Sequence, residues 1–257
     1  MVQIFADAKL NRLIYNGDWG DYNALGTHPG GWRPDLATWR REVEEQRTLL
    51  KQAQASIKPK QTFWNDGNHE WRILRAFERD PKLARTVLQM EVEDPSNIKR
   101  VADAFSMPSI FGFAKLGIKY SGTYPKGCWL KDGLDPHDNV YVHHGYTARK
   151  KSGFTISGQM DDHWASQVVG HCERLAGPIW NRKLGRDYFG IENGNCSLIG
   201  EPGLGEDIYA GIPHSDPKLM NHRQGLSILY YAERSWWPFT IKIRDGKAVW
   251  NGKVYRA

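Results

Sequence analysis

Five short runs of apolar, β-branched and aromatic residues, each ending in Gly or polar residues, constrain the fold of this chain most strongly. Such runs are typical of buried strands whose carboxyl ends open into loops. Between the first two, residues 35–57 carry apolar side chains at near-helical spacing, and Pro59 stops the helix. A strand, a helix and a second strand in this order predict an α/β fold. The runs are RLIYNGD (12–18), QTFWNDGN (61–68), NVYVHHG (139–145), SQVVGH (166–171) and DYFGIENG (187–194).

A second helix is predicted over residues 70–92, directly after the second run. An irregular insertion is expected over about 93–138, with a shorter helix around 97–105 and a Gly-rich remainder. The C-terminal part, about 187–257, is expected to be rich in β-structure. Within it, the dipeptide Asp245-Gly246 separates two alternating stretches and predicts a hairpin turn.

The composition is that of an ordinary globular protein, with 40% hydrophobic and 25% charged residues among 257. We find no repeat and no linker, so we expect a single domain over residues 1–257. No apolar stretch reaches the roughly 18 residues needed to cross a bilayer, and the first residues lack the features of a signal peptide. We therefore expect a cytoplasmic protein without a membrane partner.

The cysteines and the net charge limit the kinds of cross-link, metal site and partner that we expect. Cys128, Cys172 and Cys196 are scattered and form no C-x-x-C pair, which argues against a disulfide framework and a structural zinc site. The chain has 35 Lys and Arg against 29 Asp and Glu, a formal net charge of +6. This is a mild bias toward phosphate-bearing partners, which a solvated basic surface would explain equally well.

Side chains that ligate metals stand at four of the predicted strand ends. They are Asp18, Asn68 with the adjacent His69, His144 and His171. Because ligands bind at the carboxyl ends of strands in open α/β folds, these side chains can converge on one site. A carboxylate, an amide and two imidazoles suit a divalent ion such as Mn, Fe or Zn. Each residue alone is a common turn or loop residue, but together they predict a metal centre.

The series GD-x-x-D, GNHE, HG and GH resembles the calcineurin-like metallophosphoesterases over most of the chain. The spacing of GNHE, 50 residues after GD, is the most specific part. The later stretches GIENGNCSL and NHRQGLSILYY are similar to phage and bacterial members. The resemblance implies a four-layer α/β/β/α sandwich, and hydrolysis of a phosphomonoester or phosphodiester at two metal ions.

The resemblance also implies the metal ligands. Asp18 would bridge the two ions, and Asn68, His144 and His171 would complete the shell of the second ion. We expect Mn, with Fe, Zn, Ni or Mg as alternatives, and one or two ions per chain. Paired ions of this kind can generate a hydroxide and neutralise the phosphoryl oxygens during displacement.

Four further site residues are predicted, the first two from the same resemblance. His69 would protonate the leaving oxygen as general acid, and Asp21 would orient it, which suits a His beside a carboxylate. Arg72 and Arg149 would contact the substrate phosphate. For Arg72 the alternative is a local structural role, and for the basic run 149–151 it is a solvated surface.

The chain departs from the family pattern at the first metal. The family's opening D-x-H is absent from residues 1–11, and GHCER has Glu173 in place of the last His. Glu173 is itself an oxygen ligand that would suit a harder ion such as Mn or Mg. Two explanations are open: the chain lacks the opening strand, or it is a variant specialised for one metal. We favour the missing strand, because losing an interior strand from a complete protein would leave sheet edges and core exposed.

Other histidines have ordinary interpretations. Asp161 and His163 form a D-x-H in MDDHW, but we place them at the end of a helix, where side chains two residues apart point in different directions. His143 should face away from His144, as neighbours in a strand do. His28 is expected in a surface loop, and Cys172 is expected to be a buried, inert thiol.

Two functions follow from these expectations. The first is a metal-dependent phosphoesterase with His69 as general acid. The alternative is a degenerate, non-catalytic protein that holds one ion and binds phosphate or nucleic acid. The basic charge balance favours a nucleotide or nucleic acid as the phosphoester partner, and nothing in the sequence indicates an oligomeric state.

Overall fold

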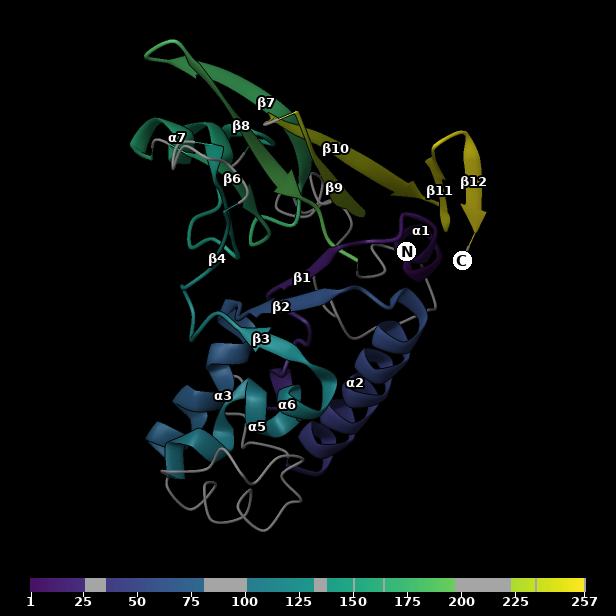
Figure 1. Ribbon diagram of the computed structural model, residues 1–257. Coiled ribbons are helices and arrows are strands. Elements are labelled where there is room, and N and C mark those ends of the chain that lie inside the picture. Colours follow the sequence, from purple (N-terminus) through teal and green to yellow (C-terminus); the bar gives the residue numbers. More distant parts are fainter. Residues whose placement is uncertain are drawn as a thin grey trace. The chain divides into compact units, whose positions relative to one another are not determined.

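The chain divides into two compact units in the computed structural model, one of residues Val2–Lys126 and one of Gly127–Ala257 together with Met1 (Figure 1). Both units combine helices with β-sheet, so the predicted α/β class is confirmed. Among the described residues, no helix is both long enough and apolar enough to cross a membrane. The structure describes residues 1–25, 36–80, 101–131, 138–149, 151–163, 165–196, 223–233 and 235–256.

The first unit, which we call the N-terminal unit, is built on a parallel three-stranded sheet with the order β1-β2-β3. Asn16 at the end of β1 pairs with Asn65 at the end of β2, so the loops after both strands leave the same edge. Its elements are α1 (Val2–Asp7), β1 (Arg12–Asn16), η1 (Asn23–Leu25), α2 (Leu36–Ile57), β2 (Gln61–Asn65), α3 (Asn68–Arg79), η3 (Val101–Phe105), α5 (Met107–Phe111), α6 (Phe113–Leu116) and β3 (Ile118–Tyr120).

Aromatic packing forms the core of this unit. Trp64, fully buried on β2, contacts the rings of Phe111 and Phe113 with centroid separations of 5.8 and 5.0 Å. Trp39 and Val43 lie one helical turn apart on α2 and join the same core. These contacts pack α2, α5 and α6 against the sheet. The loops after β1 and β2, which carry the candidate site residues, extend from the carboxyl-end edge of this sheet.

Two predictions for this unit are wrong, and a third is met in part. The helix predicted over 70–92 begins at Asn68 and ends at Arg79, because Asp80 is extended, and the sequence places Pro81 next, which disfavours the helical conformation at Asp80. Within the predicted helix around 97–105, residues 101–105 form a 3₁₀-helix. The insertion expected to be irregular contains α5, α6 and β3 in this unit, and a strand at Cys128–Leu130 in the second unit. Residues 81–100, 132–137 and His28 lie outside the described residues.

The second unit, which we call the C-terminal unit, contains two sheets. The five-stranded sheet has the order β4-β5-β6-β8-β7, in which β5, β6 and β8 run parallel. The four-stranded sheet, β12-β11-β10-β9, is antiparallel. Its elements are β4 (Cys128–Leu130), β5 (Val140–His143), α7 (Phe154–Asp162), β6 (Ser166–Val169), β7 (Leu175–Lys183), β8 (Arg186–Asn193), β9 (Gly225–Ala232), β10 (Ser235–Arg244), β11 (Lys247–Trp250) and β12 (Lys253–Arg256).

The C-terminal unit confirms two local predictions. Asp245 and Gly246 join β10 to β11 with φ angles of 50° and 66°, the left-handed backbone that a tight hairpin turn requires. Cys172 is buried in a small core with Ile156 and Met160 of α7. Burial raises the pKa of the Cys172 thiol to about 12, so the side chain is an inert hydrophobe near neutral pH.

Candidate functional site

The loop after β1 carries Asp18 in a conformation fixed by one distant carboxylate. Gly17 and Asp18 both have positive φ angles, 82° and 53°. Glu70, in the first turn of α3, accepts hydrogen bonds from the backbone N–H groups of Asp18 (2.8 Å), Trp19 (2.7 Å) and Gly67 (2.7 Å). Its side chain therefore ties the loop after β1 to the start of α3, although these segments are about 50 residues apart in the chain.

Asp18 lies against the N-terminus of α3. Its Oδ1 accepts a hydrogen bond from the backbone N–H of His69 at 3.0 Å, where the helix dipole favours a negative charge. A Cβ atom at Gly67 would come within 2.1 Å of the same Oδ1 and 2.5 Å of the Asp18 nitrogen. Only glycine fits at position 67, which is a physical reason for the Gly of the GNHE motif.

His69 is held between two carboxylates. Its Nδ1 lies 3.0 Å from Asp21 Oδ1, and its Nε2 lies 3.8 Å from Asp18 Oδ2. Burial lowers the pKa of His69, but the hydrogen bond to Asp21 and the charge of Asp18 outweigh it, so the pKa is raised above its ordinary value. The positive charge of Arg72 lowers the pKa of His69 and so opposes this rise. The arrangement favours the protonated imidazole.

Two further predicted residues belong to α3. Arg72 donates from Nη1 to the backbone oxygen of Asp21 at 2.8 Å and approaches its Oδ1 at 3.4 Å. The guanidinium therefore holds the segment at Asp21 in place. This is the local structural role that the sequence left open for Arg72. Asn68 is the first residue of α3, directly after the N-cap Gly67, and is half-buried. It lies four residues before Arg72, so the two side chains share one face of the helix.

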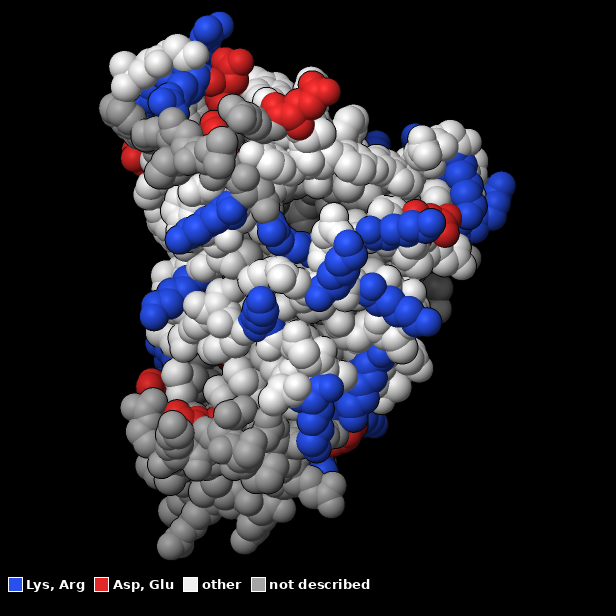
Figure 2. Space-filling model, in the orientation of Figure 1, with Lys and Arg blue, Asp and Glu red and all other residues white. Residues whose placement is uncertain are grey.

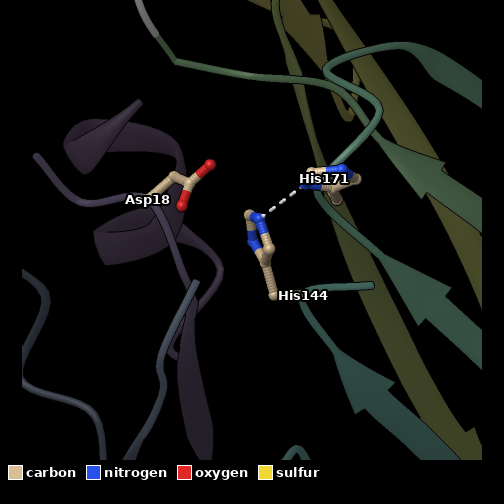
Figure 3. A group of neighbouring side chains, drawn as sticks. All are labelled: Asp18, His144 and His171. Carbon is tan, nitrogen blue, oxygen red and sulfur yellow. Dashed lines mark hydrogen bonds between the residues drawn. The ribbon is translucent and has the colours of Figure 1, made fainter. Parts of the chain in front are cut away.

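In the C-terminal unit, His144 and His171 come together. They follow β5 and β6, whose last residues His143 and Val169 pair in parallel register, so both loops leave the same edge. His171 Nδ1 lies 3.3 Å from His144 Nε2, and the two rings are edge-to-face (Figure 3). The backbone N–H of His171 also donates to the oxygen of His144 at 2.7 Å. Figure 3 also draws Asp18, the residue of the β1 loop described above.

Gly145 allows this pairing. It has a φ angle of 96°, and a Cβ at this position would lie 3.3 Å from His171 Cβ. A larger residue would therefore combine strained backbone with a tight contact against one of the two histidines. The glycine of the HG motif therefore leaves room for the histidine of the GH motif, and both belong to the C-terminal unit.

His143, next to His144 in the sequence, has a different environment. Its Nε2 lies 3.1 Å from Gln167 Oε1, and its ring stacks on Tyr141. Burial lowers the pKa of His143 to about 4. The two adjacent histidines therefore reach different partners, as the alternation of a strand predicts.

This burial makes His143 acid-sensitive. Its folded pKa lies below the ordinary 6.5, so the unfolded state binds the proton more readily, and stability is lost as the pH falls from about 6.5 toward 4. At pH 4.5 we expect a loss of about 2.5 kcal/mol relative to neutral pH. Urea unfolding of the parent and His143→Gln at both pH values measures this. Equal pH dependence in the two proteins would contradict it.

Two predicted residues have local partners instead. Glu173 has a φ angle of 51° and accepts a hydrogen bond from Asn195 Nδ2 at 3.2 Å. Arg149 lies against α7, where a Cβ at Gly158 would fall 2.5 Å from its guanidinium carbon.

The D-x-H of MDDHW has no ligand geometry. Asp161 lies on α7, whereas His163 follows the end of that helix with an extended backbone. Asp161 Oδ1 accepts a hydrogen bond from Asn181 at 3.3 Å on the exposed surface. The predicted helix end is therefore confirmed.

Two buried acids have roles that the sequence reasoning missed. No role was predicted for Glu70, although Glu three residues after a helix N-cap is a capping signal. Glu192, fully buried on β8, accepts hydrogen bonds from the backbone N–H groups of Gly153 and Thr155 at the start of α7. No local pattern reveals this second contact, because the partners are more than 35 residues apart.

Comparison with known protein families, curated proteins and solved structures finds no match to this chain. Any function must therefore be inferred from its own residues and their geometry. Within the N-terminal unit that geometry joins Asp18, Asp21 and His69. Within the C-terminal unit it joins His144 and His171.

Proposed function

We propose that the chain is a metal-dependent phosphoesterase that hydrolyses a phosphomonoester or phosphodiester, with His69 as general acid. The observation that carries the proposal is the position of His69 between Asp21 at 3.0 Å and Asp18 at 3.8 Å. A His held by one carboxylate and raised in pKa is suited to protonating a leaving oxygen near neutral pH. Asp21 would set the tautomer and orientation of the ring.

The available donors fit a divalent ion. His144 and His171 offer imidazole nitrogens 3.3 Å apart, and Asp18 and Asn68 offer oxygen atoms. This mixed set suits Mn, Fe, Zn or Ni, and we propose Mn. When bound, such an ion would activate a water and neutralise phosphoryl charge. The proposal predicts that substitution of Asp18 or of His144 weakens metal binding.

As part of the same proposal we assign a calcineurin-like α/β/β/α fold. Its support is that both units contain parallel strands, with the proposed ligands in the loops at their carboxyl ends. A nucleotide or nucleic acid is the proposed phosphoester substrate, on the basis of the net charge of +6.

A second candidate function is a non-catalytic protein that holds one ion and binds phosphate or nucleic acid. The observation that favours it is the hydrogen bond from Asn195 to Glu173, which directs the carboxylate expected at the first ion toward a local partner. With one ion, less charge neutralisation would be available for phosphoryl transfer.

Metal stoichiometry and turnover, measured together on the purified chain, separate the candidates. Mn titration by calorimetry should show saturable binding that Asp18→Asn and His144→Gln each weaken at least tenfold, whereas His163→Gln, an exposed control, leaves it unchanged. Mn-dependent release from aryl phosphates, nucleotides or DNA supports the phosphoesterase. Binding of one ion without turnover supports the second candidate, and no saturable binding overturns both.

A further inference from the structure

Three cationic side chains form a row across the C-terminal sheet. Arg244 on β10 pairs with Lys247 on β11, and Lys247 pairs with Arg256 on β12. Directly paired residues point to the same face of a sheet, with Cβ atoms about 5 Å apart, so the row spans about 10 Å. Lys242 lies two residues before Arg244 and therefore shares this face. All four side chains are exposed, and we call them the basic face.

Within the described strands β10, β11 and β12, no acid lies on the basic face. The other positions of β11 and β12 on this face are Val249 and Val254, which pair with each other. The acid next to the row is Asp245 in the turn between β10 and β11, and its Oδ2 lies 3.4 Å from Arg244 Nε. Both of these side chains are nearly 80% exposed, so the ion pair is strongly screened. Like charges placed directly opposite each other destabilise a sheet, and a bound anion would relieve that repulsion.

Figure 2 shows Lys and Arg side chains gathered at the C-terminal hairpin, where β11 and β12 lie in Figure 1. We propose that the basic face binds the phosphodiester backbone of nucleic acid without sequence preference. A row of cations at the regular spacing of strands matches a polymer of regularly spaced phosphates better than it matches one small anion. Contacts to phosphates position a protein on nucleic acid but carry no sequence information.

The main competing partner is an anionic membrane surface. Membrane-surface binding through a basic element needs an apolar face that enters the lipid headgroup region. On the basic face the exposed apolar part is one valine pair, Val249 and Val254, whereas the exposed rings of Trp237 and Phe239 belong to the opposite face of the sheet. Charge complementarity therefore favours nucleic acid. The proposal uses no residue of the candidate metal site, so it stands apart from the proposed catalytic function.

Salt-dependent binding of a fluorescein-labelled single-stranded DNA oligonucleotide tests the proposal. The full chain is titrated by fluorescence anisotropy in EDTA, which prevents hydrolysis, over a series of KCl concentrations. The triple variant Arg244→Gln, Lys247→Gln, Arg256→Gln should bind at least tenfold more weakly. The slope of log affinity against log salt should fall by about 2 to 3, because each phosphate contact contributes about 0.7 to 0.9.

A matched control removes three exposed cations from α2 instead, with Arg40→Gln, Arg41→Gln and Lys51→Gln. It makes the same change in net charge and should keep the parental affinity and slope. Equal loss in both triple variants would overturn the proposal, because general charge would then explain the binding. It would also be overturned if the basic face mattered for phosphatidylserine vesicles and not for the oligonucleotide.

Thermal unfolding distinguishes a binding role from a structural one. Removing opposed like charges should leave the melting temperature of the triple variant equal to or above that of the parent. If the melting temperature of the triple variant falls, the single variant Arg256→Gln, at the exposed end of β12, distinguishes the two roles. Parental affinity in that variant would overturn the proposal, and a partial loss at an unchanged melting temperature would support it.

Discussion

Replacement of Glu70 by Ala is expected to lower the free energy of unfolding by about 3 to 5 kcal/mol. The carboxylate is buried and accepts hydrogen bonds from the backbone N–H groups of Asp18, Trp19 and Gly67. Leaving a buried donor unsatisfied costs about 1–3 kcal/mol, and this change leaves three such donors in a partly buried setting. Urea unfolding followed by Trp fluorescence measures the loss.

Glu78→Ala is the matched control for this experiment. Glu78 lies on the same helix, α3, but is exposed, so its removal should change stability by less than about 0.5 kcal/mol. Glu70→Gln should be intermediate, because an amide keeps one acceptor oxygen but loses the charge that strengthens these bonds. A Glu70→Ala protein as stable as Glu78→Ala would show that this carboxylate does not hold the loop after β1.

The role of Glu70 illustrates how far the sequence could predict the site. Apolar runs located the strands, and because each side chain follows a strand end, Asp18 and His144 were found from local patterns. The reason why Asp18 adopts its left-handed conformation lies about 50 residues away, on α3. Contacts of that kind arise from tertiary packing and leave only a weak local signal.

The errors in the helix predictions have local causes that the hydrophobic periodicity does not show. Helix-forming residues continue after Arg79, but Asp80 precedes a proline, and this steric restriction outweighs propensity. The short helices α5 and α6 were missed because they contain five and four residues, too few for a helical period. Gly112, with a φ angle of 65°, ends the first and begins the second.

Glu173 remains a predicted ligand whose surroundings could not be read from the sequence. A Glu at the place of a family histidine has the right chemistry for a hard ion, and the sequence offers no reason to exclude it. In the folded chain its carboxylate meets Asn195, which follows β8 and is brought back beside the loop after β6 by the sheet. The partner was invisible in sequence because the pairing order β6-β8-β7 is not sequential.

Replacement of His69 by Ala is expected to reduce Mn-dependent turnover by a factor of about 10² to 10⁴, the usual contribution of a positioned general acid. Metal binding should persist, because Asp18, His144 and His171 are retained. His163→Ala, which removes an exposed histidine after α7, should keep the parental turnover. The steady-state rate on an aryl phosphodiester and Mn affinity by calorimetry are the two measurements.

The dependence of that turnover on pH gives a sharper test of the His69–Asp21 pair. A general acid acts in its protonated form, so activity should fall as the pH rises through the pKa of His69, which the hydrogen bond to Asp21 and the charge of Asp18 raise. Asp21→Asn removes the charge of this partner and should move the basic limb of the profile to lower pH. Arg72→Gln should move it the opposite way, since the guanidinium lowers the pKa of His69. An unchanged profile in both variants would exclude His69 as the group that limits turnover at high pH.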